Sequence, residues 1–395
     1  MTISRNDALA LDAADPLAPV RAEFETDDTT IYLDANSLGP MPKAVRASAA
    51  VFFDEWSKAR SKAWGERPWL SLPERLGDAI APHIGAHPGE VIFCDSTTVN
   101  QFKAVAHALA INAGRQVIVT QDSNFPTDVH VLQALVERSA GQLSLQFVDS
   151  EDDAIAALGP QTAVAALTHT DYRSGERWNM ARVNAAARAA GVLTVWDLSH
   201  SAGAVPVDLN GSGTDFAIGC GYKYLCSGPG GPAYIYARAG LADAAPPALA
   251  GWIGHADVFA FARDYQPHPG IKRFLTGTPM IGANAMAEPM IALWPAIDPR
   301  MVWAKHAALS AVLISLLDEV QGVDLISPRD PARRGGNVSF RCPGNAAVVA
   351  ALIARGIICS FRAPDAIRFG ISPLTTRFAD IYDAVAALRA VLRAL

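Results

Sequence analysis

Short apolar runs alternate with longer amphipathic stretches through the middle of the chain. Four of the runs are typical of strands buried on both faces: "EVIFCD" (90–95), "RQVIVTQ" (115–121), "AVAALTH" (163–169) and "VLTVWDL" (192–198). Ala- and Leu-rich segments with helical spacing lie between them. Strands that alternate with helices predict an α/β fold with a mostly parallel sheet flanked by helices. Ligands of such sheets bind beyond the carboxyl ends of the strands, so the residues after each run are candidates for a site.

Beyond about residue 285 the pattern changes to a smaller α+β unit. A long helical stretch, 285–297 into 302–320, leads to the strand-like "GGNVSFRC" (335–342). A helix, a strand pair ("IICSF" and "AIRFGIS") and the final helix 378–395 follow. We therefore expect a large domain at 46–284 and a small C-terminal domain at 285–395, with segment 1–45 packing against the small domain.

Composition and charge narrow the class of protein. The chain has 395 residues, 50% of them hydrophobic and 18% charged, and a net charge of −6. This composition favours a packed, enzyme-like body, and the absence of a basic run argues against nucleic-acid binding. No stretch approaches 18 uninterrupted apolar residues and the N-terminus lacks an apolar signal core, so we expect a cytoplasmic protein that binds no membrane.

The five cysteines are few and scattered. They are Cys94, Cys220, Cys226, Cys342 and Cys359, and no two form a CxxC pair. This spacing argues against a disulfide framework and against a zinc site, and we expect no metal. Small buried thiols in a reducing compartment are the simplest interpretation.

Polar and aromatic residues follow two of the predicted strands. The hydroxyls of Ser96, Thr97 and Thr98 stand where a helix begins, a position that attracts anions. Helix capping alone would also explain these three residues. Phe125, in the polar loop "DSNFPTD" (122–128), is either an aromatic offered to a site or part of the core.

Charged residues end the next two strands. Asp197 closes a fully apolar run, where a carboxylate is costly unless a cation or a strong donor meets it, and His200 follows three residues later. A structural ion pair is the alternative explanation. Lys223 closes the strand-like "DFAIGCGYKY" (215–224), 26 residues beyond Asp197 and just before the glycine-rich "SGPGG".

Four features at successive strand ends are the ones that bind pyridoxal 5'-phosphate in proteins: an anion cradle, an aromatic ring, a carboxylate and a lysine. The lysine forms the Schiff base, the carboxylate holds the pyridine nitrogen protonated, the aromatic stacks on the ring, and the helix N-terminus takes the phosphate. Each feature is weak alone, and the ordered set is much stronger. The glycines would let the chain turn tightly beside the cofactor.

Several longer motifs resemble the kynureninase family, which has the aspartate aminotransferase fold and is close to the class V aminotransferases. They are "LDANSLGPMP" (33–42), "DSTTVNQFK" (95–103), "NFPTD" (124–128), "WDLSHSAGAVPVDL" (196–209), "YKYLCSGPGG" (222–231), "GWIGH" (251–255), "RFLTGTP" (273–279) and "IRFGISPL" (367–374). The resemblance covers about residues 30–280 and resumes near 367. The pair "NSLG" and "YKYL" separates this family from cysteine desulfurases, whose lysine usually follows a histidine.

The resemblance implies a role for each matched residue. Lys223 and Asp197 would be catalytic, as Schiff-base lysine and pyridine partner, and Tyr222 would be a proton shuttle or a phosphate ligand. The remaining implied cofactor contacts are Thr97, Thr98, Phe125, Asp128, Thr168 and His200, together with Trp252 and Thr278, which would reach the cofactor from the partner subunit of a homodimer. The implied substrate contacts are Arg368, on the α-carboxylate, with Ser37 and Trp64. Alone, Arg368 could equally be a surface charge on an edge strand.

The implied reaction is hydrolysis of the Cβ–Cγ bond of L-kynurenine or its 3-hydroxy derivative, giving an anthranilate and L-alanine in tryptophan catabolism. A class V aminotransferase or a cysteine desulfurase would share the cofactor site, and Cys342 is the only loop-like candidate for a desulfurase nucleophile. A non-catalytic binding protein on this fold would be expected to lack the lysine or the aspartate, and both are present.

Overall fold

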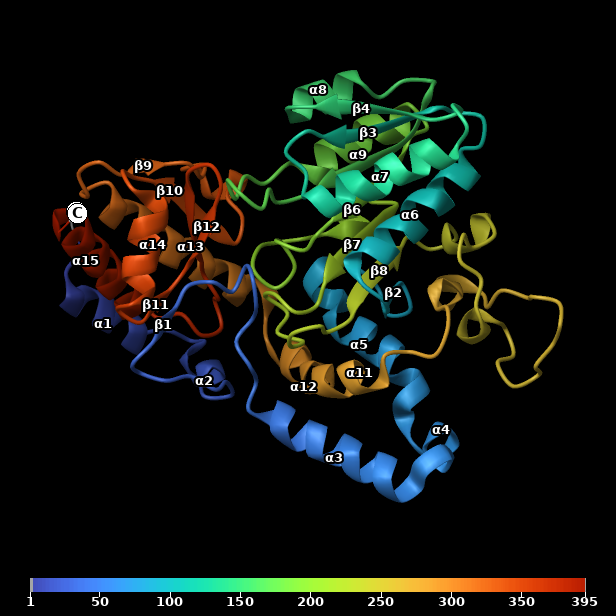
Figure 1. The fold of residues 1–395 in the computed structure, drawn as a ribbon, viewed down its shortest axis with the longest axis horizontal. Helices are drawn as coiled ribbons and strands as arrows, with labels where there is room; N and C mark the ends of the chain where they lie inside the picture. The colour runs from blue at the N-terminus through green and yellow to red at the C-terminus, as the bar shows by residue number, and fades with distance from the viewer. Residues whose placement is uncertain (1–2, 395) are drawn as a thin grey trace.

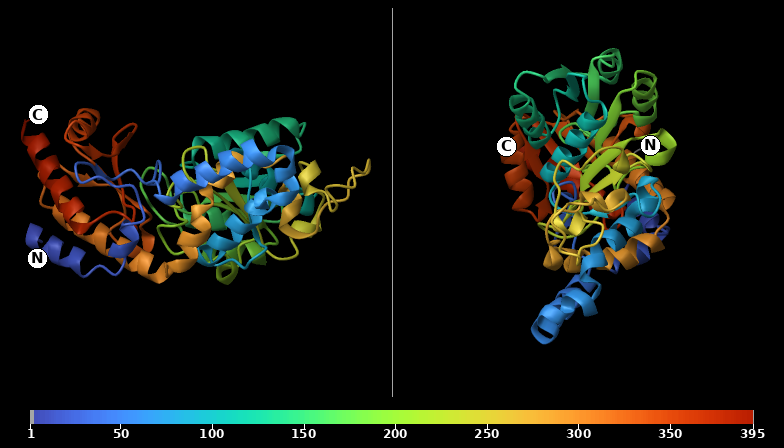
Figure 2. Two further views of the ribbon diagram at one scale, coloured as in Figure 1. Left: turned by 90° about the horizontal axis from the view of Figure 1, so that it is seen from below. Right: turned by 90° about the vertical axis from the view of Figure 1, so that its right-hand side faces the viewer.

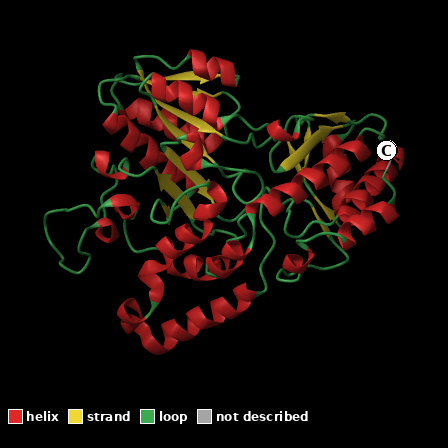
Figure 3. Ribbon diagram, turned by 180° about the vertical axis from the view of Figure 1, so that it is seen from behind, coloured by secondary structure: helices red, strands yellow, loops and turns green. Residues whose placement is uncertain are grey.

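The structure, a computed structural model, describes residues 3–394 and contains two separate groups of strands (Figures 1 and 3). The larger group is a seven-stranded sheet with the order β2-β8-β7-β6-β5-β3-β4. Its strands are β2 (Val91–Phe93), β3 (Val117–Gln121), β4 (Ser144–Val148), β5 (Thr162–Thr168), β6 (Leu193–Asp197), β7 (Phe216–Cys220) and β8 (Ala233–Ala237). β8 runs antiparallel to its two neighbours, and the other pairs are parallel. The predicted α/β fold with a mostly parallel sheet is confirmed.

Helices cover both faces of this sheet, which explains why its central strands are apolar throughout. Successive strand residues point to opposite faces. In β6, Val195 belongs to a core shared with α6 (Thr97–Ile111) and α7 (Pro126–Arg138). The next residue, Trp196, belongs to the core shared with α5 (Leu72–Ile80) and α9 (Met180–Ala189).

The smaller group is a four-stranded antiparallel sheet with the order β12-β13-β10-β9. Its strands are β9 (Asp324–Leu325), β10 (Asn337–Arg341), β12 (Ser360–Arg362) and β13 (Ala366–Gly370). It shares a third core with α13 (Pro299–Leu317), α14 (Asn345–Ile353) and α15 (Phe378–Ala394). The N-terminal α1 (Arg5–Ala13) lies against α15 (Figure 1), and β1 (Ile31–Tyr32) pairs with β11 (Ile357–Ile358).

Three local expectations need correction. The long helical stretch at 285–320 is broken into α11 (Ile281–Ala287), α12 (Pro289–Leu293) and α13, since proline cannot continue a helix. "IICSF" is not one strand, because its first half pairs with β1 and its second half with β13. The edge strand β4 and the antiparallel β8 were not predicted. The last residue of the expected helix 378–395 lies outside the described part of the chain.

We propose that the domain boundaries lie where the sequence indicates, near residues 45 and 285. The separate cores of the two sheets support this division. Arg5 pairs with Asp383, and the Asp12 carboxylate accepts from the Phe378 N–H, which supports packing of the N-terminal segment with the small domain.

Two peripheral elements extend from the body. Helix α3 (Ala44–Ala59) and the short α4 (Ala63–Glu66) project below it, as Figure 1 and the right panel of Figure 2 show. A loop around residues 255–267 extends from the right-hand side in Figure 1. Both carry exposed aromatic side chains: Phe53 and Trp56 on α3, and Phe259 and Phe261 on the loop.

Within the described residues, α13 is the one helix that is long and apolar enough to cross a membrane by length and composition. Half of that apolar window is buried inside the protein. Its Lys305 forms a buried ion pair with Asp15, and Leu309 and Leu313 pack into the core of the small sheet. Core helices pass the same composition test, and these contacts account for the apolar face of α13.

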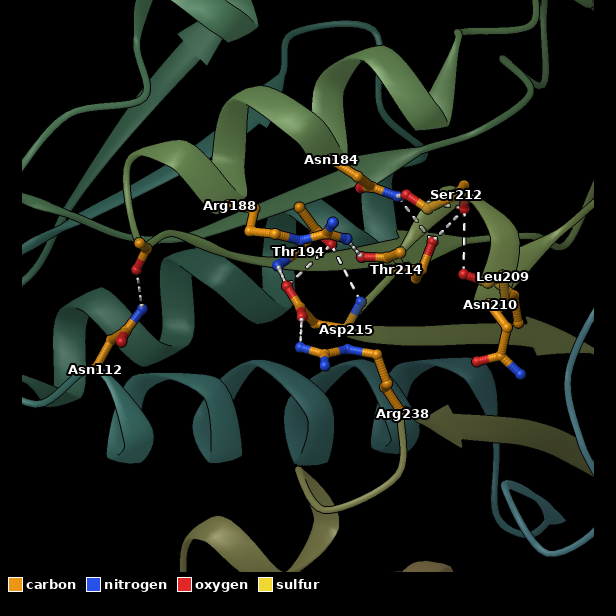
Figure 4. Close-up of polar contacts among 12 residues, drawn as sticks. Asn112, Asn184, Arg188, Thr194, Leu209, Asn210, Ser212, Thr214, Asp215 and Arg238 are labelled. Atoms are coloured by element: carbon orange, nitrogen blue, oxygen red, sulfur yellow. Dashed lines mark hydrogen bonds and ion pairs between the residues drawn. The ribbon is translucent and has the colours of Figure 1, made fainter.

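Polar side chains at the amino ends of β6 and β7 form a structural network (Figure 4). The Asp215 carboxylate accepts from the Thr194 N–H (3.0 Å) and from Arg238 Nη2 (2.7 Å), and the Asn184 amide donates to Thr214 Oγ1 (2.9 Å). The side chains of Asp215, Thr194, Thr214 and Asn184 all have protein partners here. At the opposite, carboxyl ends of the same strands, some buried polar atoms have no protein partner in the described part of the chain, among them Nδ1 of His200.

Candidate active site

A cavity of about 540 Å³ lies at the carboxyl ends of the central strands. This volume is in the usual range for a site that holds a small molecule. Eight of the predicted site residues line it: Thr97, Thr98, Phe125, Thr168, Asp197, His200, Tyr222 and Lys223. They come from the connections after β2, β3, β5, β6 and β7, as expected for a parallel sheet.

Lys223 stands in the turn after β7, and its amine faces His200. Nζ lies 2.9 Å from His200 Nε2 and 5.9 Å from the centre of the Phe125 ring. Burial, with the charge of Lys223, lowers the pKa of His200 well below its ordinary value. The imidazole is therefore neutral and accepts a hydrogen bond from the lysine through Nε2. Its Nδ1 is buried without a partner among the described residues.

Asp197 ends β6 as a buried carboxylate, and Asp128 lies beside it. Asp197 Oδ1 accepts from the backbone N–H of Ser199 at 2.5 Å. Both oxygens of Asp128, on the first turn of α7, are buried without a hydrogen-bond partner among residues 3–394. Burial and the neighbouring Asp197 raise the pKa of Asp128 well above its ordinary value. The two carboxyl groups therefore do not both carry a charge at neutral pH.

The start of α6 supplies an anion cradle at one end of the cavity. Ser96 is the N-cap, and its Oγ accepts from the Val99 N–H. The capping interpretation thus holds for Ser96 and does not account for Thr97 and Thr98. The hydroxyls of Thr98 and Thr127 lie 2.8 Å apart, which brings the first turn of α7 beside that of α6.

Aromatic rings form part of the cavity walls. Phe125 is 44% exposed and meets the ring of Tyr172 edge-on at 5.1 Å, so the core interpretation of Phe125 is wrong. Tyr222 is half-buried, and burial raises the pKa of its phenol, which stays protonated at neutral pH. The centre of the Tyr222 ring lies 5.8 Å from Lys223 Nζ.

Two glycines allow the close approaches around the lysine. A side chain at Gly39 would lie 2.0 Å from the carbonyl oxygen of Lys223, and the Gly39 N–H donates to the Tyr222 carbonyl. Gly230, which lines the cavity, has a φ of +70°. Glycine adopts that conformation at little cost, as expected for the "SGPGG" turn.

Arg368 is buried in the middle of β13, between β10 and β12, so it is not a surface charge. Its Nη1 donates to the carbonyl of Tyr172 (2.7 Å), and Nη2 donates to Ser37 Oγ (3.3 Å) and Ser360 Oγ (3.1 Å). No carboxylate in the described chain forms an ion pair with it. Burial lowers its pKa to about 10, so the guanidinium remains charged. The charge of Asp34, whose carboxylate accepts from Ser37 Oγ (2.8 Å), helps to keep it so. A buried guanidinium without a direct ion pair is a candidate site for an anion.

Six predicted residues are not part of the cavity lining. Asp128 lies beside Asp197, and Arg368, with Ser37, contacts the lining residue Tyr172. The other three have different surroundings within their own chain. Trp252 is 44% exposed beside the ring of Phe261, at the base of the projecting loop. Thr278 borders a small adjacent hollow with Asp95 and Met280. Trp64, on the projecting α4, packs edge-on against Trp69.

The cavity also contains residues that the sequence reasoning missed. Tyr172 lines it from the loop after β5 and holds Arg368 through its carbonyl. The strand-end rule would have found Tyr172, because "TDYR" (170–173) follows the predicted strand 163–169 directly. Asp95, before the Ser96 cap, and Met280 also line it. Among residues 3–394, no group of three or more His, Cys, Asp or Glu side chains could hold a metal ion.

These features fit pyridoxal phosphate. The unpartnered Nδ1 belongs to His200 of the cavity lining, and the unpartnered oxygens of Asp128 lie beside Asp197, which also lines the cavity. A polar ligand would complete such groups. The lysine, the aromatic ring and the helix N-terminus are the groups that this cofactor requires. Fold and site together define a pyridoxal phosphate-dependent enzyme of fold type I.

Comparison with known proteins gives the family. The chain is 42% identical to a kynureninase of Pseudomonas fluorescens and 43% identical to one of Burkholderia pseudomallei, in each case over 98% of this chain and 95% of the relative. The Kynureninase C-terminal domain family matches residues 302–388. The chain belongs to the kynureninase family, as its motifs predicted.

Solved structures with the same fold are more distant in sequence. A cysteine desulfurase from Thermococcus onnurineus superposes with a TM-score of 0.81 at 22% identity, covering 96% of this chain and 98% of that one. A variant of the enzyme C-DES, with glycine covalently linked to its pyridoxal phosphate, gives 0.80 at 20% identity, with 93% and 98% covered. These likenesses confirm the fold, and the family rests on the sequence relatives.

Proposed function

We propose that the chain hydrolyses the Cβ–Cγ bond of L-kynurenine or 3-hydroxy-L-kynurenine, giving anthranilate or 3-hydroxyanthranilate and L-alanine. The observation that carries the proposal is Arg368, a buried guanidinium that contacts Tyr172 at the cavity wall and forms no direct ion pair within the described residues. An amino-acid substrate brings a carboxylate, which a planar guanidinium can bind through two hydrogen bonds.

In this proposal the residues around the cavity hold pyridoxal phosphate. Lys223 would hold its aldehyde carbon, Asp197 its pyridine nitrogen and Phe125 its ring face. Thr97, Thr98 and Tyr222 would bind the phosphate, and the further contacts would be Asp128, Thr168 and His200. When bound, the cofactor supplies an electron sink for the electrons released at the substrate's Cα.

The protein side chains orient the substrate and move its protons. Arg368, with Ser37 beside it, binds the α-carboxylate and fixes which bond of Cα faces Lys223. Lys223 Nζ takes the proton from Cα, and the neutral His200 beside it can accept a hydrogen bond from the amine. Tyr222, kept protonated by burial, either delivers a proton to the Cβ that becomes the methyl of alanine or binds the phosphate. Water adds to the γ-carbonyl carbon and loses a proton, the Cβ–Cγ bond breaks with its electron pair remaining on Cβ, and the anthranilate leaves as a carboxylate.

We also propose a homodimer with shared active sites. Trp252 and Thr278 lie outside the cavity of their own chain, which donation to the partner's site would explain. The exposed Phe53 and Trp56 on the projecting α3 are apolar surface that a second copy would cover. Trp64, on the same projection, is proposed to reach an aryl group in the partner's site.

The cytoplasm is the proposed location, because all five cysteines are free thiols. The desulfurase alternative is not favoured. Cys342, its candidate nucleophile, is 6% exposed, and burial raises its pKa. An activated cysteine has the opposite properties.

The proposal is tested by adding pyridoxal phosphate and each kynurenine to the purified protein. Fluorescence of the released anthranilate and an assay for alanine report the reaction, and kcat/KM for the two substrates identifies the preferred one. Release of sulfide from cysteine, or amino transfer to a keto acid, with both kynurenines left intact, would establish the alternative function.

A further inference from the structure

Lys103, in the second turn of α6, is a buried cation to which the proposed mechanism gives no role. It is 1% exposed, and its Nζ forms an ion pair with Asp95. Nζ also donates to the carbonyl oxygen of Phe274 at 2.6 Å. The nearby thiol of Cys94 is neutral, because burial raises its pKa to about 11. Asp95 is therefore the negative charge that Lys103 offsets.

Asp95 stands at the entrance to the anion cradle. It lies between the end of β2 and the Ser96 cap of α6, and it lines the cavity with Thr97 and Thr98. Its φ of +47° is a left-handed conformation that side chains other than glycine rarely adopt. The carboxylate side chain is 28% exposed. A negative charge thus borders the same end of the cavity as the helix N-terminus.

The two charges have opposite effects on a phosphate group in the cradle. An unpaired carboxylate at Asp95 would repel it, and repulsion is strong at short range in a partly buried site. Lys103 approaches the carboxylate from the protein interior and cancels its charge. The free N–H groups and the dipole of α6 then determine the potential at the cradle.

The second contact of Lys103 connects another wall of the cavity. Phe274 ends the 3-10 helix Gly270–Phe274, and the segment that follows carries Met280 into the cavity lining. Lys103 therefore connects Asp95, which precedes the cradle, to this segment. A purely mechanical role would act through the Phe274 carbonyl, and an electrostatic role would act through Asp95, so the two can be separated experimentally.

We propose that Lys103 is a positioning residue that adapts the cradle to a phosphate dianion by neutralising Asp95. The inference rests on the proposed placement of the cofactor phosphate beside Thr97 and Thr98. The inference predicts that substituting Lys103 changes the binding of the ligand's phosphate group and leaves the binding of its pyridine ring unchanged.

The test measures binding of pyridoxal phosphate and of pyridoxal, which lacks the phosphate, to the full-length protein freed of cofactor. Lys103→Met should weaken pyridoxal phosphate binding roughly tenfold to a hundredfold, as expected for one uncompensated charge near the ligand. Its affinity for pyridoxal should not change. The double variant Asp95→Asn/Lys103→Met should recover the affinity for pyridoxal phosphate, although the contact with Phe274 is still missing.

Lys305→Met is the matched control, since Lys305 is also buried and paired with a buried carboxylate, Asp15, at 2.6 Å. It should lower thermal stability and leave both affinities as in the parent. If Lys103→Met does not fold, Asp95→Asn is the variant that tests the proposal. Removing the carboxylate charge should tighten the binding of pyridoxal phosphate and leave the binding of pyridoxal unchanged.

Three results would overturn the inference: an unchanged affinity in the lysine variant, equal weakening of both ligands, or no recovery in the double variant. An unchanged affinity of Asp95→Asn for pyridoxal phosphate would do the same where the lysine variant does not fold. A parent protein that binds no pyridoxal phosphate would instead refute the cofactor site itself.

Discussion

Lys223 Nζ lies 2.9 Å from Nε2 of His200, and the imidazole is neutral because burial and the lysine charge lower its pKa. The amine is therefore held by a hydrogen bond and not by a carboxylate. This arrangement suits the roles proposed for Lys223, first as an amine and later as a base.

The first prediction follows from this position of Lys223. The protein with pyridoxal phosphate should be yellow, and borohydride should bleach the colour and attach the cofactor permanently. Peptide mass mapping should then find the added mass on Lys223, and Lys223→Ala should neither be labelled nor turn over substrate. Label on Lys103 or Lys305, the two lysines that the fold buries, would contradict the assignment.

The second prediction concerns Asp197. Asp197→Asn keeps the shape of the side chain and removes the charge proposed to hold the pyridine nitrogen protonated. Abstraction of the Cα proton should slow by orders of magnitude, a loss of about 3–4 kcal/mol or more in transition-state stabilisation. Exchange of the Cα hydrogen with deuterated solvent measures this step directly. If exchange stays within about tenfold of the parent rate, which is 1.4 kcal/mol, another residue such as Asp128 holds the ring.

The strand-end residues could be predicted from the sequence because one rule connects them. Parallel strands bring their carboxyl ends to one edge, so Asp197, Lys223 and Phe125 could be assigned to one site before any contact was known. The antiparallel β8 escaped prediction because its run follows the "SGPGG" turn and lacks a helix before it. β4 escaped because it is an edge strand with exposed positions.

Arg368 shows what the sequence alone could not decide. An arginine between apolar residues on a strand is consistent with an exposed edge. Its burial depends on Tyr172 and Ser37, which lie 196 and 331 residues away along the chain. The position of Trp252 relative to a site could not be predicted from one chain either, because the contacts expected of it involve a second copy of the chain.

The third prediction tests Arg368. Arg368→Lys keeps the charge and loses the paired hydrogen bonds to a carboxylate, so kcat/KM for the better kynurenine should fall by about 2–4 kcal/mol. The visible spectrum of the bound cofactor should not change, because Arg368 is assigned to the substrate. Ser360→Ala is a useful comparison, since it removes a hydroxyl that holds the guanidinium and keeps the arginine. Loss of bound cofactor in the lysine variant would show that Arg368 serves the cofactor instead.

The last prediction concerns stability in acid. His306 is fully buried on α13, and its ring stacks on that of Trp303 with the ring centres 6.0 Å apart. Burial lowers the pKa of His306 to about 4. Above pH 6.5, the ordinary histidine value, the group is neutral in both the folded and the unfolded chain and contributes nothing to the pH dependence. Below pH 6.5 the unfolded chain binds a proton that the folded chain refuses, so stability falls as the pH falls towards 4. The loss from this residue should be about 2 kcal/mol at pH 5.

His306→Phe keeps an aromatic ring against Trp303 and removes the titrating group. The difference in the free energy of unfolding between pH 7 and pH 5, from urea titrations, should therefore be smaller in the variant by about 2 kcal/mol. His169, whose pKa burial lowers to about 3, titrates in both proteins and preserves part of the acid sensitivity. The prediction concerns the slope with pH and not the stability at pH 7, because the substitution also changes packing. Parallel pH profiles for the two proteins would mean that His306 is protonated in the folded state or that its neighbours rearrange to solvate it.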